Sequence, residues 1–169
     1  MIIICGPNHS GTSLSAKTLL DNGFYTGNCN HEKPYGLDYI TYEDLEFKAI
    51  CTDLLKGRKP NYSYLKTLKG DKLFVKYPSA VLFLDELIEQ IPDNVKVVFC
   101  WRDFDDNLRS FVDKTGQTES YSADHINKRC VAIAKYIGSV YYNTYESMDI
   151  EKLLEFCNEW SYKFCNARI

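Results

Sequence analysis

The feature that most constrains the fold is a short apolar run that stops at a glycine loop. Residues 2–5 read Ile-Ile-Ile-Cys, and the loop Gly6–Ser13 (GPNHSGTS) follows at once. Such a run is typical of a buried parallel strand that feeds a loop. Beyond the loop, apolar residues recur at helical spacing until Asn22 and Gly23 supply a stop. The start of the chain therefore predicts a strand, a glycine loop and a helix.

The same alternation continues along the chain. The polar stretch 115–122 is expected to be a loop, and Ser79 and Asp124 are expected to cap the helices that follow them. Besides the first strand and helix, the pattern predicts strands at 73–76, 95–101 and 139–142, and helices near 42–55, 79–91, 104–112, 124–137 and 150–165.

Strands that alternate with helices predict an α/β fold. We expect a single domain over residues 1–169, with a P-loop-type parallel sheet of about four to five strands and helices on both faces. Ligands of such sheets bind at the carboxyl ends of the strands. The glycine loop, Lys76 and Arg102 all follow strands directly, so they are expected to converge on one site.

Composition excludes several classes of function. The net charge of −3 removes the long-range attraction that a nucleic-acid partner needs, although a local anion pocket stays compatible with it. The seven cysteines contain no C-x-x-C pair, and Cys29 with His31 makes only half a metal site, so no metal is expected. No signal peptide or membrane span is predicted, which favours a cytoplasmic protein without a membrane partner.

The loop has the frame of a Walker A motif, with one change. Walker A has the form G-x-x-x-x-G-K-[ST], and its lysine reaches the β- and γ-phosphates of a nucleoside triphosphate. Here Thr12 stands in place of that lysine, between Gly11 and Ser13. No apolar strand ends in an aspartate that would serve as Walker B. The loop therefore fits a smaller anion better than a triphosphate with magnesium.

Two motifs, in the correct order, give the chain a resemblance to PAPS-dependent sulfotransferases, which use 3′-phosphoadenosine-5′-phosphosulfate (PAPS). Residues 9–13 (HSGTS) resemble the family's 5′-phosphosulfate loop, [KR]-S-G-T-[ST], and Arg102 with Ser110 resembles its 3′-phosphate site. An arginine fork and a hydroxyl suit a terminal phosphate. The resemblance implies PAPS as cosubstrate and assigns it to Asn8, His9, Ser10, Gly11, Thr12, Ser13, Arg102 and Ser110.

The resemblance also suggests catalytic residues. Lys76 matches a family lysine that contacts the transferred group, and Glu43, in the segment Tyr-Glu-Asp before an apolar helix, is the candidate base. An acidic residue at a helix start is also favoured by the helix dipole, and His31 and Glu32 are alternative bases. His9 departs from the family's Lys or Arg and could be protonated beside phosphates or act as an acid.

Several points stay open at this level. The family's C-terminal glycine loop over the 3′-phosphate is not visible, and residues 114–117 could take its place. The acceptor hydroxyl or amine could belong to a carbohydrate or a phenolic small molecule, because tyrosines are abundant around the expected cleft. The oligomeric state is not indicated. Alternative functions are a P-loop nucleotide or small-molecule kinase and a non-catalytic binder of adenosine 3′,5′-bisphosphate.

Overall fold

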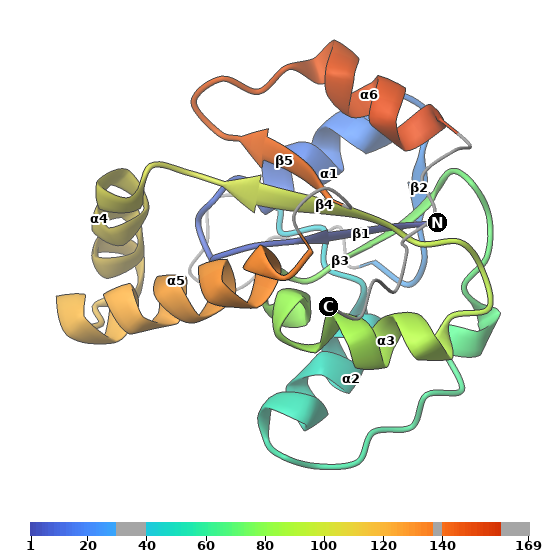
Figure 1. The fold of residues 1–169 in the computed structure, drawn as a ribbon, viewed down its shortest axis with the longest axis horizontal. Helices are drawn as coiled ribbons and strands as arrows, with labels where there is room; N and C mark the ends of the chain where they lie inside the picture. The colour runs from blue at the N-terminus through green and yellow to red at the C-terminus, as the bar shows by residue number, and fades with distance from the viewer. Residues whose placement is uncertain (30–39, 137–139, 160–169) are drawn as a thin grey trace.

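The computed structural model describes residues 1–29, 40–136 and 140–159 (Figure 1). A five-stranded parallel sheet in the order β2-β3-β1-β4-β5 forms its centre. This sheet confirms the α/β prediction of a parallel sheet of four to five strands. The strands are β1 (Ile2–Cys5), β2 (Tyr25–Thr26), β3 (Leu73–Lys76), β4 (Lys96–Trp101) and β5 (Tyr141–Thr144).

Helices cover both faces of the sheet. Ile2 and Ile4 face a core beneath α1 and α6, whereas Ile3 and Cys5 face a second core beneath α2, α3 and α5. The helices are α1 (Thr12–Asp21), α2 (Leu45–Leu55), α3 (Leu84–Gln90), α4 (Phe104–Thr115), α5 (Glu119–Ala134) and α6 (Ile150–Asn158), with 3₁₀ turns η1 (Leu65–Thr67) and η2 (Pro78–Phe83).

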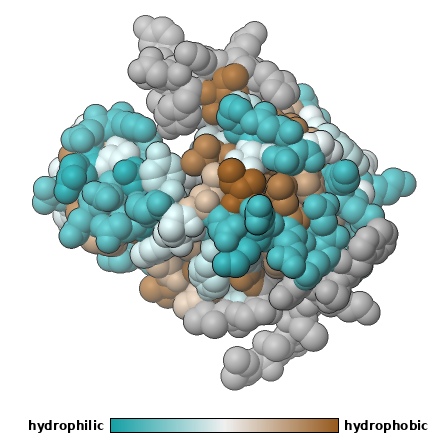
Figure 2. Space-filling model, turned by 90° about the horizontal axis from the view of Figure 1, so that it is seen from above, coloured by the Kyte–Doolittle hydropathy of each residue, from teal (hydrophilic) through white to brown (hydrophobic). Residues whose placement is uncertain are grey.

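The register of the sheet places three strand ends together. Ile4 pairs with Lys76 on one side and with Val98 on the other. Because all the strands run in the same direction, the glycine loop, the end of β3 and the end of β4 lie at one edge. Helix α4 projects beyond this edge, and hydrophilic residues cover that end of the molecule (Figures 1 and 2).

Three local predictions were wrong. Ser79 caps no helix; it lies in η2, which begins at Pro78, and its hydroxyl contacts Arg129 instead. The stretch 115–122 is not all loop, because the Thr118 hydroxyl accepts a hydrogen bond from the Tyr121 amide and α5 starts at Glu119. Asp124 therefore lies inside α5. A local capping bond outweighed the polar composition of this stretch.

The sheet edges also differ from the prediction. β2 was not predicted, since two residues carry no period, and β5 spans 141–144 where 139–142 was expected. The last helix ends at Asn158, where Glu159 has an extended backbone (φ −67°, ψ 130°), so the predicted unbroken helix to Cys165 was wrong; residues 160–165 lie outside the described residues. No described helix has both the length and the apolar character needed to cross a membrane.

Candidate functional site

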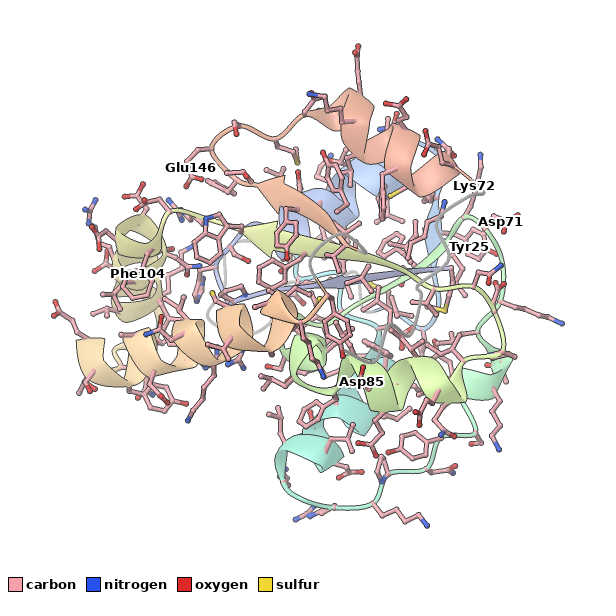
Figure 3. All side chains as sticks on the ribbon, in the orientation of Figure 1. Tyr25, Asp71, Lys72, Asp85, Phe104 and Glu146 are labelled. Atoms are coloured by element: carbon pink, nitrogen blue, oxygen red, sulfur yellow. The ribbon has the colours of Figure 1, made fainter. Side chains whose placement is uncertain are left out.

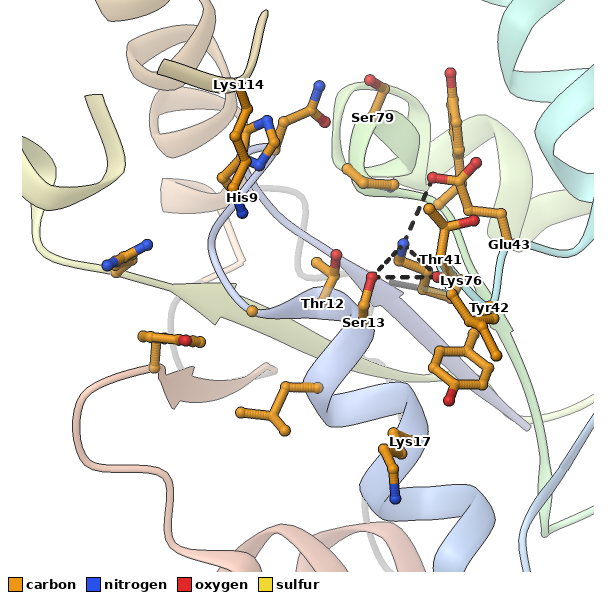
Figure 4. Close-up of a pocket in the computed structure, with 18 of the residues that line it drawn as sticks. His9, Thr12, Ser13, Lys17, Thr41, Tyr42, Glu43, Lys76, Ser79 and Lys114 are labelled. Atoms are coloured by element: carbon orange, nitrogen blue, oxygen red, sulfur yellow. Dashed lines mark hydrogen bonds and ion pairs between the residues drawn. The ribbon is translucent and has the colours of Figure 1, made fainter. Parts of the chain in front are cut away.

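A cavity of about 640 Å³ opens at the carboxyl ends of β1, β3 and β4 (Figure 4). Its volume lies in the range of small-ligand pockets. Seven segments line it, and they include all three features that the sequence placed at strand ends. They are the glycine loop, the start of α1, residues 40–43, Lys48 of α2, residues 76–79, Arg102 with the end of α4, and Tyr145 after β5.

The glycine loop is held in place by close backbone packing. Gly6 has a φ of 147°, and a Cβ at this position would stand 2.4 Å from the Cys100 carbonyl oxygen. Only glycine fits such an approach. The Ser10 hydroxyl donates to the Pro7 carbonyl at 2.7 Å, so this fully buried side chain braces the loop and does not line the cavity.

The loop ends at the first turn of α1. Gly11 is the residue before the helix, with a φ of 93°, and the Tyr145 ring lies against it. Thr12 and Ser13 then line the cavity, while the first amides of the helix have no carbonyl partner within it. A helix N-terminus of this kind suits an anion. Of the predicted phosphate loop, Asn8 and residues 11–13 therefore line the cavity.

Lys76 is the most constrained cation of the cavity. Its side chain is 2% exposed, and its ammonium donates to the Thr41 carbonyl at 2.7 Å and to the Ser13 hydroxyl at 3.3 Å. It also forms an ion pair with Glu43 at 3.5 Å. Burial lowers the pKa of Lys76, and the neighbouring Glu43 carboxylate opposes that shift. These contacts fix the lysine on the floor of the cavity (Figure 4).

Glu43 lies between two lysines. One carboxylate oxygen is paired with Lys76 and the other with Lys48 at 2.6 Å. Glu43 was expected at the start of the helix, but it lies just before α2, whose N-cap is the buried Asp44. Each carboxylate oxygen keeps accepting capacity beyond one bond. Glu43 can therefore still accept a proton from a group that enters the cavity.

Arg102 lines a different part of the cavity and is held by other partners. Its guanidinium stands 4.6 Å from the centre of the Tyr145 ring and 3.3 Å from the Glu146 carboxylate. Figure 3 shows Glu146 on the segment after β5. Ser110 is half-buried on α4 but is not among the residues that line the cavity. The fold thus does not bring the predicted Arg102 and Ser110 together at this cavity.

His9 lies at the cavity wall in a cationic environment. Its φ of 64° is unusual for a residue other than glycine, and its ring packs edge-on against Phe111. The Nδ1 atom is buried and has no hydrogen-bond partner among the described residues. Burial, and then Lys114 and Arg102, lower the pKa of His9 to about 4. At neutral pH the imidazole is therefore uncharged.

The charge of the cavity is opposite to that of the whole chain. The chain carries a net charge of −3. Among the described residues, the only carboxylate that lines the cavity is Glu43, whereas the lining cations are Lys17, Lys48, Lys76, Arg102 and Lys114. Such a concentration of cations attracts an anionic ligand.

Sequence reasoning missed part of this site. Lys48, Tyr145 and Ser79 line the cavity and were not assigned to it. Ser79 follows Lys76 by three residues, so its position just after a strand end could have assigned it to the site from the sequence. Lys114, at the end of α4, does line the cavity, whereas the alternative bases His31 and Glu32 lie outside the described residues.

Neither a metal cluster nor a known family marks the described part of this chain. Within the described ranges, no three His, Cys, Asp or Glu residues are grouped in a way that could hold a metal ion. No protein-family model matches the chain, and no curated protein is significantly similar to it. The fold and the cavity together describe an α/β protein with a cationic pocket beside a glycine loop.

Proposed function

We propose that this protein is a PAPS-dependent sulfotransferase. The observation that carries the proposal is the meeting of the glycine loop, buried Lys76 and Glu43 in one cationic cavity, with Arg102 at another part of its wall. The loop offers an anion cradle without a Walker lysine. The two lysines beside Glu43 supply charge where a transferred group would lie.

The residues of the cavity fit the cosubstrate. The first amides of α1, with Thr12 and Ser13, would hold the 5′-phosphosulfate, because unpaired helix amides and hydroxyls are suitable donors for its oxygens. Arg102 would bind the 3′-phosphate through its planar fork. Lys114 lines the same cavity and would take the part that Ser110 was expected to play. The excess of lining cations matches an anion with several charges.

The chemistry assigns one role to each of the two central residues. In sulfuryl transfer the acceptor oxygen forms a bond to sulfur while the bond from sulfur to the phosphate oxygen breaks, and adenosine 3′,5′-bisphosphate leaves. The acceptor proton passes to Glu43, which acts as general base. Lys76 stabilises negative charge on the transferring sulfuryl group and on the oxygen that leaves. Both are held in place before any ligand binds.

The kinase alternative is less well supported by the same geometry. A P-loop kinase needs a loop lysine on the β- and γ-phosphates and a carboxylate for magnesium. The loop position of that lysine is taken by the nearly buried Thr12. Glu43, the single lining carboxylate among the described residues, is already paired with two lysines. A magnesium ion would have to compete with both.

Replacement of the proposed base tests the catalytic part of the proposal. Glu43→Gln should lower the rate of sulfuryl transfer from PAPS by about 10² to 10⁴ fold, since it removes the proton acceptor. The rate is measured as release of adenosine 3′,5′-bisphosphate in the presence of phenolic and carbohydrate acceptors. Binding of adenosine 3′,5′-bisphosphate, measured by calorimetry, should change little.

The matched control is Glu46→Gln. Glu46 is an exposed carboxylate on the first turn of α2 and does not line the cavity, so this change should leave the rate near that of the wild type. A Glu43→Gln protein with full turnover would remove Glu43 as base. A wild-type protein that binds the bisphosphate but never releases it from PAPS would support a non-catalytic binder.

A further inference from the structure

A buried arginine lies directly behind the cavity wall. Arg129, on α5, is 5% exposed, and its guanidinium donates to the Ser79 hydroxyl at 2.6 Å and to the His125 carbonyl at 2.9 Å. Ser79 lines the cavity (Figure 4). The two side chains join α5 to the turn that follows β3. Arg129 therefore contacts the cavity through a single hydroxyl group.

The charge of Arg129 is not balanced among the described residues. No carboxylate there lies within ion-pair distance of it, and its buried Nε has no hydrogen-bond partner. An unpaired buried cation costs free energy. An anion in the adjoining cavity would supply the missing charge, so the cost of burial would be partly offset when the cavity is occupied.

The geometry also settles the direction of the Ser79 hydroxyl. A serine hydroxyl carries one proton and two lone pairs. Because the guanidinium can only donate, Ser79 accepts from Arg129, and its own proton stays available. No described residue accepts that proton. In Figure 4 Ser79 lies between the His9 and Lys114 side of the cavity and Glu43. The proton can therefore be donated to a ligand.

We propose that Ser79 is a hydrogen-bond donor to a sulfonate or phosphate oxygen of the ligand in this cavity, with Arg129 as the positioning residue that orients and polarises it. The identity of the ligand as PAPS rests on the proposed function, whereas the oxyanion class rests on the unbalanced cation. Ser79 follows Lys76 by three residues, so both donors belong to the same strand end. Together they would hold two sides of one oxyanion.

The first experiment uses inorganic sulfate as the probe and does not depend on the nucleotide. Sulfate at about 10 mM should raise the melting temperature of the wild type more than that of Ser79→Ala, because a ligand stabilises only the state that binds it. Sodium chloride at equal ionic strength corrects for charge screening. General salting-out by sulfate acts on both proteins alike.

The matched control is Ser122→Ala. Ser122 is a fully buried serine of α5 whose hydroxyl bonds to the Thr118 carbonyl, away from the cavity. It should keep the sulfate response of the wild type. An equal response in Ser79→Ala and the wild type would overturn the inference.

The second experiment measures nucleotide binding by calorimetry. Ser79→Ala should weaken PAPS binding about tenfold, the usual effect of losing a hydrogen bond to a charged group. If Ser79→Ala loses more affinity for PAPS than for adenosine 3′,5′-bisphosphate, the contact is to the sulfonate. If the two losses of affinity are equal, the contact is to a phosphate. Unchanged binding of both ligands contradicts the inference.

Variants of Arg129 separate its charge from its fold-stabilising role. Arg129→Gln keeps a side-chain donor but removes the charge, so it should weaken PAPS binding, whereas Arg129→Lys should keep most of the wild-type affinity.

If neither nucleotide binds the wild type but the sulfate response still needs Ser79, the proposed function fails and the oxyanion site stands. If PAPS binds to Arg129→Gln and to Ser79→Ala as tightly as it binds to the wild type, the proposed function stands and this inference fails.

Discussion

The two cationic parts of the cavity are built in different ways. Lys76 is buried and has three acceptors within 3.5 Å, which are the Ser13 hydroxyl, the Thr41 carbonyl and the Glu43 carboxylate. Arg102 is partly exposed and is held by the Tyr145 ring and by the Glu146 carboxylate, which is itself exposed. One cation is therefore fixed in advance, and the other is held by partners that a ligand can replace.

This difference fits the two tasks of the proposed site. A group that stabilises developing charge works best when it needs no rearrangement during the reaction. A group that selects the cosubstrate can instead exchange one anion for another, as Arg102 would exchange Glu146 for a phosphate. The contrast predicts that changes at Lys76 affect folding and changes around Arg102 affect binding.

The largest effect is expected for Lys76→Met. Removal of the ammonium leaves the Thr41 carbonyl without its donor and breaks a buried ion pair, so the free energy of unfolding should fall by about 3 kcal/mol. Urea denaturation measures this change. Lys48→Met is the control, because Lys48 is 46% exposed in its pair with Glu43 and should cost less than about 1 kcal/mol. Equal losses of unfolding free energy in Lys76→Met and Lys48→Met would contradict the view that burial fixes Lys76 in advance.

A smaller effect is expected from His9 as the pH falls. Unfolded histidine binds a proton near its usual pKa of 6.5, whereas burial and nearby cations lower the pKa of folded His9 to about 4. The unfolded state therefore takes up the proton first, and the stability that neutral His9 contributes is lost as the pH falls from 6.5 towards 4.

The measurement is urea denaturation of the wild type and His9→Asn at pH 7 and pH 4.5. The variant should lose less stability over this range than the wild type. Part of the loss should remain, because burial also lowers the pKa of His125 to about 4. Parallel losses in the two proteins would show that His9 is not buried as a neutral group.

The smallest effect is expected for Glu146→Gln. This change removes the carboxylate that competes for Arg102, and a partly exposed ion pair is worth at most about 1 kcal/mol. Binding of adenosine 3′,5′-bisphosphate should tighten by up to about fivefold. Binding of adenosine 5′-monophosphate, which lacks the 3′-phosphate, should stay unchanged in calorimetry. Tighter binding of both nucleotides would show that Arg102 does not recognise the 3′-phosphate.

The parts of the fold that were predicted are those with a strong local pattern. β1, β3 and β4 are buried apolar runs, and each was found within one residue of its predicted bounds. β2 was missed because two residues have no period, and the start of α5 was missed because Thr118 caps it within a polar stretch. Sequence periodicity reveals neither a two-residue strand nor a helix start that is fixed by a single capping bond.

The site was predictable where residues follow strands directly. The glycine loop, Lys76 and Arg102 all reach the cavity, as parallel topology requires. Ser110 does not line it, because its direction depends on how α4 packs, which sequence spacing does not encode. Lys48 and Arg129 were missed because their roles arise from tertiary contacts with Glu43 and Ser79.

The most direct test of the proposed function compares two nucleotides in a thermal-shift experiment. Adenosine 3′,5′-bisphosphate at about 100 times its dissociation constant should raise the melting temperature by about 5 °C or more. ATP with magnesium should raise it much less, because Thr12 replaces the lysine that a triphosphate needs. Arg102→Ala should remove the preference for the bisphosphate. Stabilisation by ATP with magnesium but not by the bisphosphate would contradict the sulfotransferase proposal and favour a kinase.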